Sequence, residues 1–214
     1  MNHPVANTQM LKSSYKPLIF LVLFILCNRT NLIAQHDISK YEIRWAFWHP
    51  FTALKVKHRL PEAMVIYKEV KQAKLLDTLE SGGKLDAFRH TFTMSYLSQK
   101  INVKKLRKLG KAHEKGNKLQ FEKLKLEFGE RPDSMACEMD LRNNELGFEI
   151  GSSHKRINAA DLKLIVLTQI HAGKAWYLKR NPYFKYVDCA GNIIDMAEYV
   201  GKWGVPKCLI PTDQ

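Results

Sequence analysis

Ionisable side chains recur at helical spacing shortly after residue 80. Asp86, Arg89, His90 and Thr93 are three or four positions apart, so they share one stripe of a helix. An apolar stripe runs beside them on the same helix and contains Leu85, Phe88, Phe92 and Tyr96. Together the stripes cover more than half of the helix surface, so part of the polar stripe should be buried. Imidazole and carboxylate groups in such a place can bind a metal or transfer protons.

Two further segments offer the same kinds of side chain. His113 continues the apolar face of a helix that follows residue 102, and Glu114 comes directly after it. A third helical face carries a carboxylate, carboxamides and glycines: Asp140, Asn143, Asn144, Gly147 and Gly151. Burying a charged group without a partner costs several kcal/mol. We therefore expect the three helices to bring these polar groups together.

Three motifs in this region resemble those of a bacterial domain family. The motifs are Asp86-Ala87-Phe88-Arg89-His90, Ala112-His113-Glu114 and Met139-Asp140-Leu141-Arg142-Asn143-Asn144-Glu145-Leu146-Gly147. They are similar to the pattern D-x-F-R-H, H-E and M-D-x-x-N-N-x-x-G of DUF6973, a domain of unknown function, over about residues 60–155. The resemblance implies no established reaction. Many relatives carry a histidine where this chain has Arg142, so one potential metal ligand is missing here.

One hypothesis is a metal-assisted hydrolase. His90, His113 and Asp140 would bind zinc or another divalent metal, and a water molecule would complete the coordination. Glu114 would be the general base and Arg89 would hold an anionic group of the substrate. Four residues would orient the ligands or support the structure: Asp86, Asn143, Asn144 and Gly147. No H-E-x-x-H motif is present, and the adjacent side chains of His113 and Glu114 diverge by about 100° on a helix.

Two other hypotheses use the same residues. In the first, His90 or His113 is the acid or base of a metal-free hydrolase, lyase or nuclease, tuned by Asp86 or Asp140. In the second, the chain is a non-catalytic envelope or interaction protein, and the polar groups form a buried network that holds the helices in register. The sequence leaves open whether the protein is an enzyme.

The elements that must position these residues are mainly helices. Apolar periodicity predicts a helix opened by Pro61, others starting near Lys84 and Asn102, one after Pro132-Asp133, and one capped by Asn158. Gly116-Asn117 is expected to end the helix that starts near Asn102. Residues 118–128 fit either a strand or a helix, and we predict a helix. The fold class is therefore mainly α, a multi-helix bundle with a small C-terminal β-hairpin or irregular appendix.

The chain divides into four predicted parts. Residues 1–35 are a signal peptide, 36–60 an aromatic-rich segment with one or two helical turns, 61–173 the helical domain with the polar site, and 174–214 a hairpin or irregular tail. Turns are expected at Asn181-Pro182 and Gly191-Asn192. Trp45 and Trp48 could bind a sugar or a lipid headgroup, but packing is the expected role.

The first 35 residues predict export. Lys12 and Lys16 precede an apolar run over residues 17–27, too short for a membrane span of roughly 20 residues. Cleavage is expected near Ala34 or Gln35, and translation could start at Met1 or Met10. Lipidation of Cys27 and an uncleaved anchor are the less favoured alternatives. The mature protein would be periplasmic or secreted.

The chain is strongly basic, with a formal net charge of +13. Removing the predicted signal peptide takes away three basic residues and no acidic one, which leaves +10. This charge favours an anionic envelope polymer, a lipid or nucleic acid as a partner. The lysines of residues 100–125 are expected to form a solvated helix face. No glycine-rich nucleotide-binding motif is present, and the sequence does not indicate an oligomeric state.

Three cysteines remain in the mature chain. Export permits disulfides, and Cys189 and Cys208 are close together in the turn-rich tail, so they are the expected pair. Cys137 would stay unpaired as a small buried residue on a helix.

Overall fold

The computed structural model describes residues 38–214 except 125, 127 and 128. All of them belong to one compact unit, Ile33–Gln214. The predicted signal peptide lies outside the described residues. Among the residues that are described, no helix combines the length and the apolar character needed to cross a membrane.

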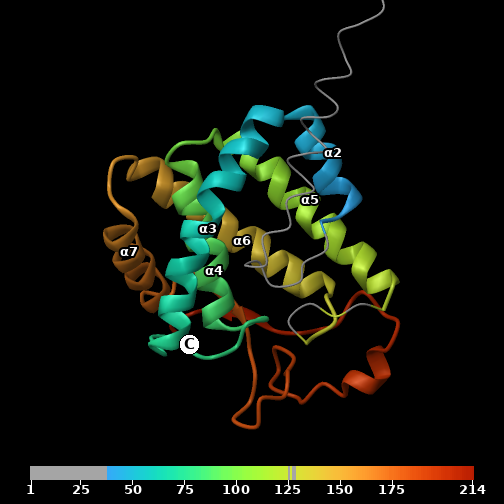
Figure 1. Cartoon of the computed structure of the whole chain (residues 1–214). Helices are drawn as coiled ribbons and strands as arrows, with labels where there is room; N and C mark the ends of the chain where they lie inside the picture. The colour runs from blue at the N-terminus through green and yellow to red at the C-terminus, as the bar shows by residue number, and fades with distance from the viewer. Residues whose placement is uncertain (1–37, 125, 127–128) are drawn as a thin grey trace, which may run out of the picture. The chain divides into compact units, whose positions relative to one another are not determined.

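The fold is mainly α, as the periodicity predicts. Its helices are α2 (Lys40–Trp48), α3 (Pro50–Gln72), α4 (Lys84–Ser98), α5 (Val103–Glu122), α6 (Ser134–Ser153) and α7 (Ala159–His171). They are followed by β1 (Trp176–Leu178), the short 3-10 helix η1 (Met196–Tyr199) and β2 (Leu209–Pro211). The central helix is α4, which packs against α3, α5, α6 and α7 (Figure 1).

The core forms around the apolar stripe of α4. Leu85, Phe88 and Phe92 are fully buried there, and the rings of Phe88 and Phe92 stack. The polar stripe beside it meets α6, where His90 lies 3.2 Å from Asp140. The central helix therefore stabilises the fold with one face and positions the polar site with another.

The aromatic segment is more helical than we predicted. Its first helix, α2, starts with a capping box: the Ser39 hydroxyl accepts from the backbone N–H of Glu42, and the Ser39 N–H donates to the Glu42 carboxylate. The next helix starts at Pro50 and continues through Pro61, so the prediction that Pro61 opens a helix is wrong. Pro50 already occupies the first helical turn, and Pro61 lies on an exposed face inside the helix.

The predicted end of α5 is also wrong. The helix continues past Gly116 and Asn117 to Glu122, so residues 118–122 belong to it and do not start a separate helix. Both residues have a packing role. A Cβ atom at Gly116 would lie 2.7 Å from the Ser39 hydroxyl, and the Asn117 amide donates to Glu114. Tertiary contacts therefore override their tendency to end a helix.

The C-terminal segment is irregular, and its two strands do not form a hairpin. They pair antiparallel, with Tyr177 opposite Ile210, and residues 179–208 run between them. Turns form at Asn181 and Asp188, and a disulfide joins Cys189 to Cys208. Figure 1 shows this segment in orange and red at the end of the bundle opposite the α2–α3 junction.

Candidate functional site

The start of α4 is fixed by side-chain hydrogen bonds. The Asp77 carboxylate accepts from the backbone N–H groups of Lys84 and Leu85, at 2.6 and 3.0 Å. One turn into the helix, Asp86 accepts from the backbone N–H of Gly82 at 2.7 Å. The carboxylate of Asp86 therefore has a fixed position at the beginning of the polar stripe.

Glycines of α6 allow that helix to touch α4. A Cβ atom at Gly147 would lie 2.5 Å from the Thr91 carbonyl oxygen, and one at Gly151 would lie 2.1 Å from that of Ser95. Both separations are shorter than a Cβ contact allows, so only glycine fits this backbone approach. The approach brings the polar face of α6 against the polar stripe of α4.

Three buried side chains meet where the two helices touch. The Nε2 atom of His90 lies 3.2 Å from an oxygen of Asp140 and 3.5 Å from an oxygen of Asp86. The side chains of His90, Asp140 and Asp86 are 9%, 8% and 5% exposed. Their potential ligand atoms all lie within 4.8 Å of one another. We call these three residues the Asp–His–Asp cluster.

Arg89 and Asn144 determine the hydrogen-bonding state of His90. The guanidinium of Arg89 donates to Asp86 through Nε and Nη2, and its Nη2 also lies 3.2 Å from Nε2 of His90. A guanidinium only donates, so Nε2 of His90 accepts from Arg89 in the tautomer that carries the ring proton on Nδ1. In that tautomer the Nδ1 proton faces the amide oxygen of Asn144 at 3.4 Å, whereas in the other tautomer Nε2 donates toward Asp140. Burial and the positive charges of Arg89 and His113 hold the pKa of His90 well below its usual value.

The cluster has the chemistry and the spacing of a cation site. An unprotonated Nε2 and two carboxylate oxygens are all acceptors, and acceptors that face one another repel unless a positive charge lies between them. Ligand atoms around a tetrahedral zinc with bonds of about 2.0–2.2 Å are about 3.3–3.6 Å apart. The separations from His90 of 3.2 and 3.5 Å are close to that range. Arg89 pairs with Asp86, one of the two carboxylates.

His113 lies beside the cluster and is oriented by α2. Its ring centroid is 6.5 Å from that of His90, and its Nδ1 lies 3.3 Å from the carboxylate of Glu42. Burial alone would raise the pKa of Glu42, but its hydrogen bond to His113 and the charge there, with the bonds to Ser39, lower it to about 2. Sequence reasoning missed Glu42, whose local signal was only the S-x-x-E capping box.

The other predicted site residues have different surroundings. Glu114 is buried and accepts from the amide of Asn117 at 3.0 Å. Asn143 binds both the N–H and the carbonyl of Trp176, at 2.9 Å each, and so ties β1 to α6. Arg142 pairs with Glu138 on an exposed face. The structure thus assembles Asp86 with His90 and Asp140, whereas the predicted ligand His113 contacts Glu42.

A second polar cluster joins the C-terminal segment to the loop that precedes α6. It consists of Glu130, Arg180 and Tyr186, which we call the Glu–Arg–Tyr cluster. The guanidinium of Arg180 donates to Glu130 and to the Tyr186 hydroxyl, and that hydroxyl donates to Glu130. Burial and the charge of Glu130 raise the pKa of Tyr186, so the hydroxyl keeps its proton.

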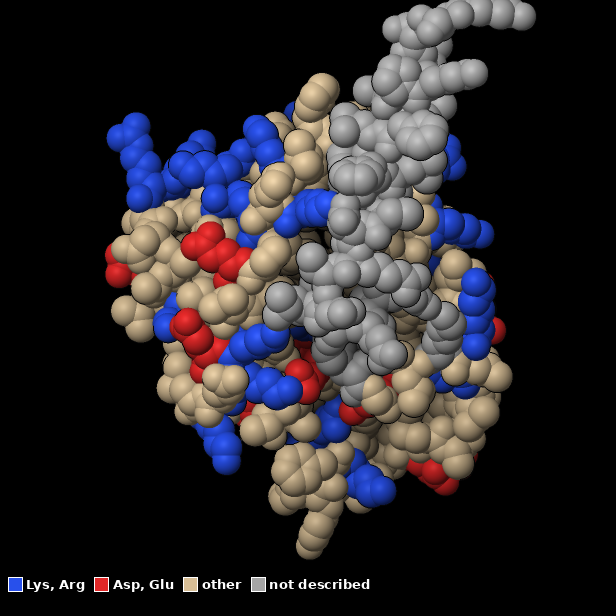
Figure 2. All heavy atoms as spheres, viewed as in Figure 1, with Lys and Arg blue, Asp and Glu red and all other residues tan. Residues whose placement is uncertain are grey.

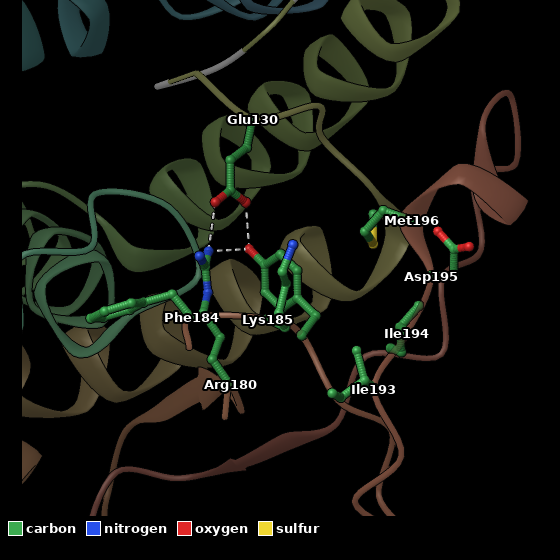
Figure 3. A pocket seen from close by; sticks show the side chains of 9 residues that line it. Glu130, Arg180, Phe184, Lys185, Ile193, Ile194, Asp195 and Met196 are labelled. Carbon is green, nitrogen blue, oxygen red and sulfur yellow. Dashed lines mark hydrogen bonds and ion pairs between the residues drawn. The ribbon is translucent and has the colours of Figure 1, made fainter. Parts of the chain in front are cut away.

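This cluster lines one side of a pocket of about 480 Å³. Figure 3 shows Glu130 and Arg180 facing each other, while Ile193, Ile194 and Met196 lie along the other side. Within the pocket Glu130, Arg180 and Tyr186 bind one another, and Lys185 and Asp195 are its other polar lining residues.

Comparison with known proteins gives one match. The family model described as a domain of unknown function, DUF6973, matches residues 43–174. The match starts within α2 and ends just before β1, so it includes the Asp–His–Asp cluster, Arg89 and His113. No curated protein and no solved structure matches the chain.

Proposed function

Because the chain belongs to the DUF6973 family, whose function is unknown, we propose a function from the site itself: metal-assisted hydrolysis of an anionic substrate. Asp86, His90 and Asp140 would hold a divalent cation such as zinc. The observation that carries the proposal is the position of Nε2 of His90, 3.2 and 3.5 Å from oxygens of Asp140 and Asp86, which is close to the ligand separations around a tetrahedral ion. All three ligand atoms lie within 4.8 Å of one another.

Residues next to the Asp–His–Asp cluster suit the other roles in metal-assisted hydrolysis, which are proton transfer and substrate binding. A bound divalent cation would activate a water molecule for attack on an ester or related bond. In its neutral form His113 donates its Nδ1 proton to Glu42, and because its ring lies beside His90 we assign it the role of proton acceptor for that water. Arg89 is 14% exposed and can bind an anionic group of the substrate. The general base in this proposal is therefore His113 rather than Glu114.

The setting that we propose is outside the cytoplasm, where an acidic envelope polymer is one available substrate. Two observations support export. The sequence of residues 1–35 has the order of charge and apolar residues found in signal peptides. The Cys189–Cys208 disulfide suits an oxidising compartment.

A second candidate function is non-catalytic. Arg89 already donates to Asp86 and to Nε2 of His90, so it places one positive charge where a cation would otherwise be needed. In this alternative the cluster holds α4 and α6 in register within an envelope or interaction protein. The two candidate functions predict different effects when Arg89 is removed. If the cluster is a structural network, the protein becomes less stable, whereas if it is a metal site, the protein binds its substrate more weakly.

Hydrolysis of bis(4-nitrophenyl) phosphate by zinc-loaded protein tests the proposal. We expect zinc-dependent turnover that falls about a hundredfold in His113→Gln, the typical effect of losing a general base. In Arg89→Gln we expect a higher KM with most of the stability retained. The matched control is Glu138→Gln, an exposed acid on α6. No turnover with any divalent metal, together with a large loss of stability in Arg89→Gln, would favour the network instead.

A further inference from the structure

The junction between α2 and α3 exposes large apolar side chains close together in the sequence. We call it the aromatic corner, and its residues are Ile43, Phe47, Trp48, Phe51 and Leu54. Phe51 is 81% exposed and Trp48 is 67% exposed. The rings of Phe47 and Trp48 contact each other edge to face, with centroids 5.6 Å apart. Scattered exposed apolar residues are ordinary, but a contiguous group of them indicates an interaction surface.

The opposite face of the same two helices is firmly packed. Trp45 is buried, and its indole N–H donates to the Lys105 carbonyl of α5 at 3.0 Å. Thr52, one residue after Phe51, is buried as well. The inward faces are thus anchored in the domain, so the aromatic corner points outward on a rigid support.

The charges around the aromatic corner are positive. Exposed basic side chains flank it on both helices: Lys40, Arg44, Lys55 and Lys57. Between residues 40 and 60 the only acid in the sequence is Glu42, and its carboxylate bonds to Ser39 and His113 instead of facing solvent. Over the start of α3, at the top of the view in Figure 2, tan and blue side chains lie together without red ones.

We propose that the aromatic corner binds the surface of an anionic lipid bilayer. Aromatic and aliphatic side chains with adjacent lysine and arginine are the composition of elements that lie in the membrane interface. Tryptophan is favoured at headgroup depth, and each basic residue near the surface gains from anionic lipid. A polyanion such as nucleic acid or a wall polymer would satisfy the basic residues but would leave Phe51 and Leu54 without an apolar environment.

Vesicle binding by the full chain tests this proposal. The vesicles contain equal amounts of phosphatidylglycerol and phosphatidylcholine, and binding is measured by sedimentation. Phe51→Ser should weaken binding roughly tenfold, the loss expected for one buried aromatic side chain. The matched control is Tyr183→Ser, because Tyr183 is also 81% exposed and lies in the C-terminal segment at the other end of the bundle. High salt or pure phosphatidylcholine should also weaken binding.

A second readout locates the contact. Brominated phosphatidylglycerol vesicles should quench the fluorescence of Trp48, obtained as the difference between wild type and Trp48→Phe. This reports on the aromatic corner even if the apolar run of residues 17–27 also inserts. Equal vesicle binding by Phe51→Ser and Tyr183→Ser, with no quenching of Trp48, would overturn the proposal. So would a loss of DNA or wall-polymer binding in Phe51→Ser while its vesicle binding is unchanged.

Discussion

Two buried polar clusters among the described residues differ in how their groups are matched. Where the C-terminal segment meets the residues just before α6, the cations Arg180 and Lys207 pair with the anions Glu130 and Asp133, and we call this the balanced cluster. Between α4 and α6, by contrast, the Asp–His–Asp cluster brings three potential ligand atoms within 4.8 Å of one another. The first cluster has the pairing of a structural network, and the second has the spacing that a cation site needs.

This difference distinguishes a cluster that stabilises the fold from a candidate cation site. Burial of polar groups is ordinary when donors and acceptors match, and it then says little about function. The gathering of an imidazole nitrogen and two carboxylate oxygens within 4.8 Å is less ordinary, because these are the ligand types of a zinc site. The family match at residues 43–174 includes the whole Asp–His–Asp cluster, whereas it includes only the anions of the balanced cluster and ends before Arg180, Tyr186 and Lys207.

The largest expected loss of stability is in the balanced cluster. Lys207 and Asp133 are each 3% exposed and lie 2.6 Å apart, so Lys207→Ala leaves a buried carboxylate without its partner. We expect a loss of about 3–5 kcal/mol in the free energy of unfolding, measured by urea denaturation. Lys202→Ala, at an exposed lysine of the same segment, is the control. Equal losses in the two variants would mean that this pair is not structural.

The next effect concerns the helix contact that assembles the Asp–His–Asp cluster. A methyl group at Gly147 would lie 2.5 Å from the Thr91 carbonyl oxygen, so Gly147→Ala must push α6 away from α4. We expect a loss of about 3 kcal/mol, at the upper end of the range for overpacking, together with weaker metal binding. Thermal unfolding and zinc titration measure the two effects. A variant with wild-type stability would show that the helices are not held in backbone contact.

The pair formed by His113 and Glu42 should make the stability of the protein depend on pH. The pKa of Glu42 is about 2 in the folded protein, against 4.5 without these contacts. A lowered pKa gives a carboxylate a stabilising contribution that is fully present above pH 4.5 and is lost as the pH falls toward 2. Glu42→Gln should therefore cost about 2 kcal/mol at pH 7 and much less near pH 2. An unfolding free energy that differs from wild type by the same amount at both pH values would contradict this explanation.

The smallest expected change in stability is at Asp140. Without metal, Asp140→Asn removes one of two neighbouring carboxylates and keeps the shape of the side chain. We expect the free energy of unfolding to fall by less than in Lys207→Ala, because the carboxamide keeps the volume and an accepting oxygen of the side chain. Chelator-treated protein and urea denaturation test this. A loss of about 3 kcal/mol or more would place Asp140 in a balanced network.

Local sequence patterns predicted much of the Asp–His–Asp cluster and its surroundings. The positions of Asp86, Arg89 and His90 on one helix face, and of Asp140 and Asn144 on another, follow from helical spacing. Their meeting was predicted because buried charges need partners. The pairing of Cys189 with Cys208, expected from their closeness in the tail, is present in the structure.

Tertiary contacts account for what the sequence did not predict. Glu42 reaches His113 across 71 positions, and no local pattern indicates which acid will orient that histidine. Gly116 looks like a helix end until its contact with Ser39 is known. Asn143 was expected near the polar site, but its amide matches the two backbone groups of Trp176.

Calorimetric titration of the chelator-treated full chain with zinc tests the central claim most directly. We predict one bound zinc per chain in wild type and in Glu138→Gln, with binding lost in His90→Gln and in Asp140→Asn. Thermal stability should rise with zinc only in the two proteins that bind it. A metal site at the Asp–His–Asp cluster would be contradicted if wild-type protein bound no zinc, or if His90→Gln and Asp140→Asn bound it as tightly as wild type.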